Sequence, residues 1–133
     1  MANAIYPIYK QALLDGLTDI DLNDGTVKVA LVDTGTYTYS AAHDFLNDLT
    51  GTVGTAQTIG TTTVTNGLFD GDNVTFTAVS GATVEALVIY IDTGVSTTSR
   101  LVAYIDTGVT GLPVTPNGGD ITITWNASGI FQL

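Results

Sequence analysis

The chain has 133 residues, 44% of them hydrophobic, which is enough for one domain with a buried core and too few for two comfortable ones. Thirteen carboxylates stand against three cationic side chains, and the formal net charge of −10 argues against proteins that bind nucleic acid or an anionic membrane surface. The lack of cysteine excludes disulfides, thiolate catalysis and cysteine zinc sites. We therefore predict a single acidic domain over residues 1–133.

The first predicted element is a short helix over residues 7–15, within an N-terminal segment of residues 1–16. Proline is tolerated in a first helical turn, and Gly16 can end the helix. The apolar side chains of the segment include Ile5, Tyr6, Ile8, Tyr9, Ala12 and Leu13. So many on a short element predict that it packs on the domain or on a neighbouring subunit. The segment lacks the features of a signal peptide, which predicts a cytoplasmic start.

The next segments alternate between a strand and weaker signals. Residues 27–32 predict a strand after a turn cluster. A second helical turn is predicted near residues 41–47, with Ser40 as N-cap and Asp44 in its first turn. Residues 50–65 are nearly all Thr, Gly, Val, Ala, Gln and Ile, which predicts an extended surface arm or loop.

The second half of the chain predicts further strands. Asn66-Gly67 is a strong hairpin signal. Residues 73–79 alternate, with Val74, Phe76 and Ala78 predicted to face inward, and residues 83–91 have the apolar pattern of a strand covered on both faces. More strands are predicted at residues 100–105, 121–125 and 130–131. The 24 threonines suit half-exposed strands. The fold class is thus mostly β, an antiparallel β-sandwich or barrel of about seven to eight short strands.

An Asp-Thr-Gly tripeptide follows three of the strand-forming runs, beginning at Asp33, Asp92 and Asp106. An aspartic protease presents its two catalytic carboxylates in this way, across a pseudo-dyad. Here, however, Asp92 and Asp106 are only fourteen residues apart, as expected for the ends of neighbouring strands rather than for two lobes. The favoured interpretation is three turns, in which Asp accepts backbone hydrogen bonds and Gly takes a positive φ.

A calcium loop is the next possibility, because Asp19, Asp21 and Asn23 have oxygen ligands at suitable spacing. The register fails, since Asp24 occupies the position that needs glycine and Ala30 the position that needs glutamate. Asp70 and Asp72 could add to a weakly held cation. Solvated turn carboxylates are the favoured interpretation, so no metal site is predicted.

Three single residues are of types that often belong to functional sites. His43 is the only histidine and is predicted to lie on the surface, and Trp125 is predicted to be in the core. Glu85 is predicted either to face solvent or to pair with Lys28 or Arg100. No catalytic residue and no cofactor-binding residue is predicted, so the sequence indicates a structural protein rather than an enzyme.

Several segments, in order, carry a resemblance to a known family: YPIYKQALLDGL, GTVKVALVDTGTYTYSAAHDFL, TVTNGLFDGDNVTFTAV, ALVIYIDTG, LVAYIDTG, GGDITITW and the terminal GIFQL. Nearly end to end, the chain resembles small proteins encoded among the head and structural genes of tailed bacteriophages. The resemblance implies a virion structural protein, made in the host cytoplasm and bound as decoration or cement on the capsid exterior. The implied partner is the major capsid protein.

The residues themselves suggest where such contacts would lie. Exposure and composition favour capsid or subunit contacts on the N-terminal segment and on the arm of residues 50–65. The predicted contact residues are Ile5, Tyr6, Tyr9, Thr52, Val53, Thr58 and Ile59. A homo-oligomer, preferably a trimer, is expected. The alternative is a tail or host-surface module that binds glycans. Both hypotheses predict a protein that does not bind nucleic acid, in keeping with its net charge of −10. Both also predict no insertion in a membrane, because the longest apolar run, residues 86–91, falls far short of the roughly 20 residues that a spanning helix needs.

Overall fold

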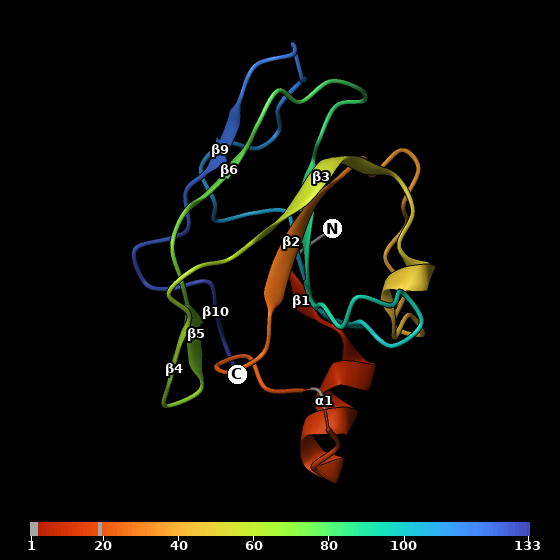
Figure 1. Cartoon of the computed structure of the whole chain (residues 1–133), viewed down its shortest axis with the longest axis vertical. Helices are drawn as coiled ribbons and strands as arrows, with labels where there is room; N and C mark the ends of the chain where they lie inside the picture. Colours follow the sequence, from red (N-terminus) through yellow and green to blue (C-terminus); the bar gives the residue numbers. More distant parts are fainter. Residues whose placement is uncertain (1–2, 19) are drawn as a thin grey trace.

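The computed structural model describes residues 3–18 and 20–133 of the chain. In these residues ten strands form three antiparallel sheets, accompanied by one α-helix and one 3-10 helix. The smaller sheets lie beside the largest one in a sandwich-like arrangement, and β3 contacts β6 (Figure 1). The prediction of a mostly β, antiparallel fold with one N-terminal helix is confirmed.

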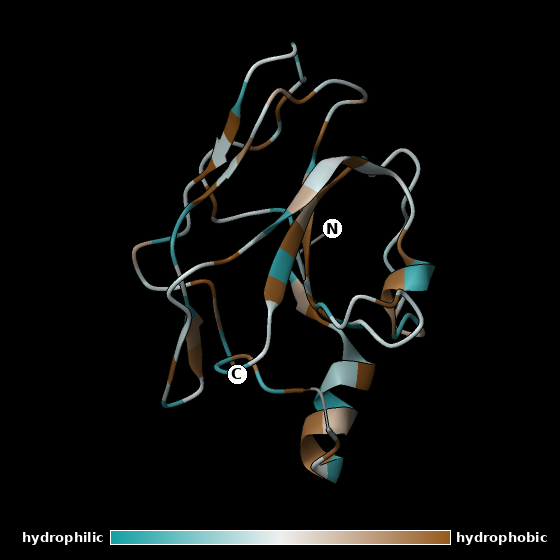
Figure 2. Ribbon diagram, in the orientation of Figure 1, coloured by the Kyte–Doolittle hydropathy of each residue, from teal (hydrophilic) through white to brown (hydrophobic). Residues whose placement is uncertain are grey.

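The largest sheet has five strands in the order β1, β8, β7, β2, β3. Their bounds are Ala4–Ile5 for β1, Arg100–Ile105 for β8, Ala86–Ile91 for β7, Val27–Val32 for β2 and Thr52–Thr58 for β3. All six residues of β7 are buried, as predicted for a strand covered on both faces. The hydrophobic colouring of Figure 2 also follows the central strands, which form the core.

The other five strands form two small sheets. The strand order in one is β10, β5, β4, with bounds Phe131–Gln132, Leu68–Asp70 and Thr63–Thr65, and the other pairs β6, Val74–Phe76, with β9, Ile121–Ile123. Asn66 and Gly67 join β4 to β5 with φ angles of 51° and 81°. Positive φ at both central residues is the signature of a type I′ turn, so the predicted hairpin is confirmed.

Helix α1 spans Pro7–Asp15, the range that the sequence predicts. Proline stands in its first turn, and Gly16 takes the left-handed conformation with φ 64° and ends the helix. Tyr9 and Ala12 are buried, whereas Leu14 is exposed. The helix therefore packs on its own domain through one face. Burial on this face raises the pKa of Tyr9 to about 12.

The second helical turn lies at the end of its predicted range. The 3-10 helix η1 spans Leu46–Asp48, and Phe45 rather than Ser40 is its N-cap residue. The hydroxyl of Ser40 instead accepts a hydrogen bond of 3.2 Å from the backbone N–H of Ala42. Ser40 thus stabilises a separate turn before η1.

Two sequence predictions need correction. Residues 50–65 do not form a free arm, because β3 pairs with β2 at both of its ends, on either side of a bulge at Gly54, and β4 pairs with β5. Ala78 is exposed at a φ of 51°, and Val79 takes the inward position instead. The backbone turn at Ala78 breaks the alternation that the sequence pattern assumed.

Candidate functional site

The first two Asp-Thr-Gly segments are hydrogen-bonded turns. The carboxylate of Asp33 accepts a hydrogen bond of 2.8 Å from the N–H of Gly35. The carboxylate of Asp92 accepts one of 3.0 Å from the N–H of Gly94, which has a φ of 85°. The predicted hydrogen-bonded turn is confirmed at both positions, but the predicted positive φ of glycine holds at Gly94 and not at Gly35.

The third segment lies at the opposite end of the sheet from the second. Strands β7 and β8 form an antiparallel pair, so the turns that follow them lie at opposite ends of the sheet. At the third turn the side chain of Asn3 accepts hydrogen bonds from the N–H groups of Asp106 and Thr107, at 2.7 and 3.0 Å. Because β2 and β8 both run antiparallel to β7, Asp33 and Asp106 emerge at one end with β7 between them.

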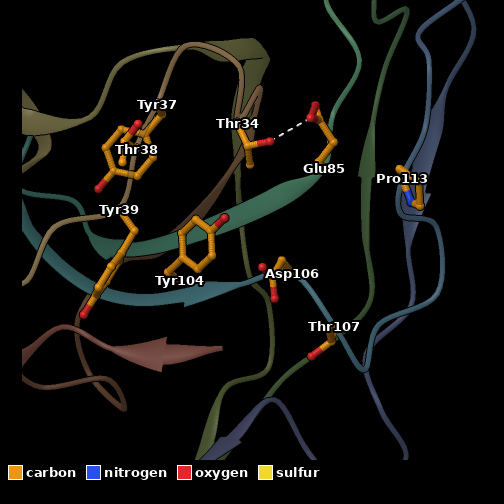
Figure 3. Close-up of a pocket in the computed structure, with 9 residues that line it drawn as sticks. All are labelled: Thr34, Tyr37, Thr38, Tyr39, Glu85, Tyr104, Asp106, Thr107 and Pro113. Atoms are coloured by element: carbon orange, nitrogen blue, oxygen red, sulfur yellow. Dashed lines mark hydrogen bonds between the residues drawn. The ribbon is translucent and has the colours of Figure 1, made fainter. Parts of the chain in front are cut away.

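An open pocket of about 520 Å³ lies at that end of the sheet (Figure 3). The loop after β2, the start of β7, the end of β8 and the connection to β9 all contribute to it. Its lining residues are Thr34, Tyr37, Thr38, Tyr39, Glu85, Tyr104, Asp106, Thr107 and Pro113. Two carboxylates and no cationic side chain line it, so its potential is negative.

Glu85 does not make either of its predicted ion pairs. One carboxylate oxygen, Oε2, accepts a hydrogen bond of 2.7 Å from the hydroxyl of Thr34, and Oε1 is buried without a hydrogen-bond partner among the described residues. Lys28 instead lies 3.1 Å from Asp92. The guanidinium of Arg100 lies over the ring of Phe45, 4.7 Å from its centroid. The cations therefore stay outside the pocket.

Two of the three tyrosine rings that line this pocket are buried. Tyr37 and Tyr104 are only 2% and 4% exposed. Burial, followed by the negative charges of Asp106 and Glu85, raises the pKa of Tyr104. Trp125 is buried too, as predicted, and its indole N–H donates to the backbone oxygen of Asp72 at 2.8 Å. Stacking on a glycan needs an exposed ring face, and among the tyrosines that line the pocket only the half-buried Tyr39 is accessible.

A chain of hydrogen bonds connects the N-terminal segment to the loop after β2. The hydroxyls of Tyr6 and Tyr37 are 2.7 Å apart, and the Tyr37 hydroxyl is 2.8 Å from Nδ1 of His43. Tyr6 is buried and Tyr37 nearly so. His43 is therefore a half-buried structural partner, which corrects its predicted place on the surface.

Tyr37→Phe is expected to destabilise the protein more than Tyr6→Phe. Removing the Tyr37 hydroxyl leaves the buried Tyr6 hydroxyl unpaired, which costs about 1–3 kcal/mol. Removing the Tyr6 hydroxyl leaves Tyr37 with His43 as its partner. Urea unfolding of both variants and of the double variant measures the difference, and equal losses in the two single variants would refute the assigned chain of bonds.

The acidic loop before β2 is arranged as a turn. The Oδ1 atom of Asp21 accepts hydrogen bonds from the N–H groups of Asn23 and Asp24, at 2.7 and 3.2 Å. Asp19 lies outside the described residues. In the described residues, no three His, Cys, Asp or Glu side chains gather in a way that could hold a metal ion.

Asp92 makes the folded state sensitive to acid. The N–H of Gly94, and then Lys28, lower the pKa of Asp92 below its ordinary value. A lowered folded-state pKa stabilises the protein above the unfolded pKa of about 4, and this stabilisation is lost as the pH falls through the folded-state value. Asp92→Asn should therefore lose at most about 1 kcal/mol of stability at pH 7, because the ion pair is partly exposed, and less than that at pH 2.5.

The difference in unfolding free energy between the parent and Asp92→Asn separates the contribution of Asp92 from those of the other carboxylates. Partial burial and the nearby Asp48 raise the pKa of Asp44, which acts in the opposite direction. That contribution is common to both proteins and cancels in the difference. Urea unfolding at pH 7 and pH 2.5 is the measurement, and a loss that grows on acidification would contradict the assignment.

The predicted contact residues fall into two groups. Tyr6, Tyr9, Val53 and Ile59 are buried within the chain itself, so the premise that their side chains are exposed is wrong. Ile5 is half-buried in β1, while Thr52 and Thr58 are exposed at the two ends of β3. Contact with another protein stays a prediction for all seven, and only the last three present side-chain surface for it.

Strand β3 forms an open edge of the large sheet. In the described part of the chain, its only pairing partner is β2. The backbone oxygen of Gly51 accepts a hydrogen bond from the N–H of Asp33, and the N–H of Ile59 donates one to the oxygen of Val27, so the backbone groups of Gly51 and Ile59 face β2. In an antiparallel pair the backbone groups of successive residues alternate between the two sides of the strand. The backbone groups of Thr52 and Thr58 therefore point away from β2.

No known protein-family model matches the chain, and no characterised protein was found to match it. In the residues that the structure describes, no helix is long and apolar enough to cross a membrane.

Proposed function

We propose that this protein is a structural component of a tailed-phage virion and decorates the outer surface of the capsid. The assignment is supported by the segments that resemble phage head proteins, which occur in the same order along the chain. Their turns and strands make up the fold, since the Asp-Thr-Gly segments end β2, β7 and β8. The partner is the major capsid protein, and attachment stabilises the head.

The open edge of β3 is the observation that carries the proposal. Seven residues, Thr52–Thr58, form a strand with no charge and no proline, in which a register shift interrupts the pairing with β2 between Val53 and Gln57 and Gly54 takes a φ of 70°. Natural proteins usually protect a sheet edge with charges, prolines, bulges or a covering element, because an open edge pairs with other chains; β3 has no charge and no proline, and its bulge leaves the two ends of the strand regular. Exposed threonines and free backbone groups suit β3 to accept a strand from the capsid protein.

Many weak contacts, rather than one tight site, would hold such a protein on the head. A repeated lattice supplies the contacts, and linked copies gain avidity. A cyclic homo-oligomer, with a trimer preferred, fits the symmetry points of a capsid. The net charge of −10 keeps free copies apart until they meet a complementary surface.

Copy number tests the proposal against a tail or glycan-binding module. Quantitative mass spectrometry of purified heads and tails, separated from each other, compares this protein with the major capsid protein. Decoration predicts many copies in the head fraction. A few copies confined to the tail fraction, or none in particles, would refute it.

A further inference from the structure

The dipeptide Asn-Gly occurs twice in the chain, at Asn66-Gly67 and at Asn117-Gly118. Both asparagines are exposed. Asparagine before glycine is prone to deamidation, because glycine has no side chain to hinder attack by its own backbone nitrogen on the asparagine amide. Since glycine follows both asparagines, the sequence predicts similar reactivity at the two positions. A large difference between them would come from the fold.

Hydrogen bonds occupy the reacting groups at the second position. The N–H of Gly118 donates to the backbone oxygen of Val79 at 2.7 Å, and the side-chain oxygen of Asn117 accepts from the N–H of Gly119 at 2.9 Å. The first bond engages the nitrogen that would attack. The second holds the side chain in an Asx turn, with its oxygen directed to Gly119. Deamidation at Asn117 therefore requires that this turn opens first.

The reacting groups at the first position are not engaged. Within the described residues, no hydrogen bond occupies the side chain of Asn66 or the N–H of Gly67. The bonds of this turn go to carbonyl oxygens instead, because Nε2 of Gln132 donates to Asn66 at 2.9 Å and the N–H of Leu133 donates to Gly67 at 2.9 Å. The bond from Gln132 polarises the peptide group between Asn66 and Gly67, which favours loss of the proton from its nitrogen.

The geometry of the β4–β5 turn requires this dipeptide. The turn lies at the tip of the hairpin (Figure 1), and its φ angles of 51° and 81° favour Asn, Asp or Gly at both positions. A Cβ atom on Gly67 would lie 2.9 Å from Nε2 of Gln132 and 3.1 Å from the backbone oxygen of Leu133. Glycine is therefore the residue that fits after Asn66, and the reactive pair is built into the hairpin.

We infer that Asn66 is a site of spontaneous deamidation in the folded protein and that the fold protects Asn117. The backbone nitrogen of Gly67 attacks Cγ of Asn66, and the new N–C bond closes a succinimide ring as the Cγ–Nδ2 bond breaks. Nδ2 leaves as ammonia with the proton that Gly67 loses. Water then opens the ring at either carbonyl, which yields aspartate or isoaspartate. The reaction consumes only water.

Either product changes the hairpin. Both products add a carboxylate beside Gln132 and Leu133, and isoaspartate also adds a methylene group to the main chain. A two-residue type I′ turn fixes the register of its strands, so the extra atom disturbs the pairing of Thr65 with Leu68. Strand β10 joins the same sheet through β5 and is loosened with it. The inference rests on this hairpin and not on attachment to a capsid.

Peptide mapping of the intact protein in mildly alkaline buffer follows both positions in one sample. Chymotrypsin generates the peptides, because the chain has only three Lys and Arg residues for trypsin. Mass spectrometry detects conversion of amide to acid, and electron-transfer fragmentation distinguishes aspartate from isoaspartate. Asn66 should react at least about tenfold faster than Asn117, because the turn at Asn117 must first break two hydrogen bonds. In urea the two rates should converge, since neither turn persists.

Three results in this experiment would overturn the inference: equal rates in the folded protein, faster loss at Asn117, or a folded protein that stays unmodified while the chain in urea reacts. A ratio that persists in urea would also overturn it, because flanking sequence would then set the rates. Asn66→Gln is the matched control, since glutamine closes the larger ring slowly. It should remove the fast phase of ammonia release and leave Asn117 unchanged, and a retained fast phase would place the reaction elsewhere in the chain.

Discussion

Replacing Tyr6 by alanine is expected to lower the free energy of unfolding by about 3–5 kcal/mol, as large aromatic truncations in a core do. Tyr6 is 0% exposed, its ring lies 5.1 Å from that of Tyr39, and its backbone N–H bonds to Val102 of β8 at 3.0 Å. The substitution removes a buried ring and the hydrogen bond to Tyr37 together. Domains of this size are stable by only about 5–15 kcal/mol, so the substitution should remove a large fraction of the total stability.

Leu14→Ala is the matched control on the same segment. Leu14 is 84% exposed, and its truncation should change stability by no more than about 0.5 kcal/mol. Urea unfolding at 25 °C measures both variants. A Tyr6→Ala protein as stable as the parent, yet unable to join particles, would show that Tyr6 is a contact residue as the sequence suggested, and that its burial in the core is wrong.

Ala56→Lys is expected to weaken attachment to heads by at least about tenfold without unfolding the domain. Ala56 lies in β3 and lines a small pocket together with Leu46 and Tyr90, and a lysine there puts a charge where a capsid segment bound at β3 would exclude water. In the free protein the long stem can carry the ammonium group into solvent, so stability should change little. The measurement is co-sedimentation of purified protein with heads that lack it, at fixed ionic strength.

Ala127→Lys is the control for added charge. Ala127 is exposed in the turn before β10, and its substitution adds the same charge through the same chemical change. It should bind heads like the parent. Equal weakening by both substitutions would mean that net charge, rather than the β3 edge, governs attachment. Binding of both variants as tight as that of the parent would mean that the β3 edge does not contact the capsid.

The sequence predicted elements well where the hydrophobic pattern was strong. Helix α1 and strands β2 and β8 begin and end at the predicted residues. Each has a dense apolar pattern and a clear stop, such as Gly16 after α1. In these segments local propensity and tertiary packing favour the same structure.

Prediction failed where a weak local pattern concealed burial or pairing. In β3 only Val53 is buried, so its sequence resembles a loop, and its strand geometry comes from pairing with β2. Tyr6 was predicted to be an exposed contact residue because it lies in a short apolar segment at the start of the chain. Its burial depends on Tyr37, which is 31 residues away in sequence and hydrogen-bonds to it. The pocket beside β3 also depends on long-range neighbours, since it combines Ala30 with Tyr90. No local periodicity encodes such contacts.

Electron cryo-microscopy of purified heads, with and without this protein, tests the central claim most directly. Decoration predicts repeated density on the outside of the capsid that disappears when the protein is removed and returns when purified protein is added back. In the bound state, β3 should be the strand nearest the capsid surface. Heads of identical density in the presence and absence of the protein would contradict the account.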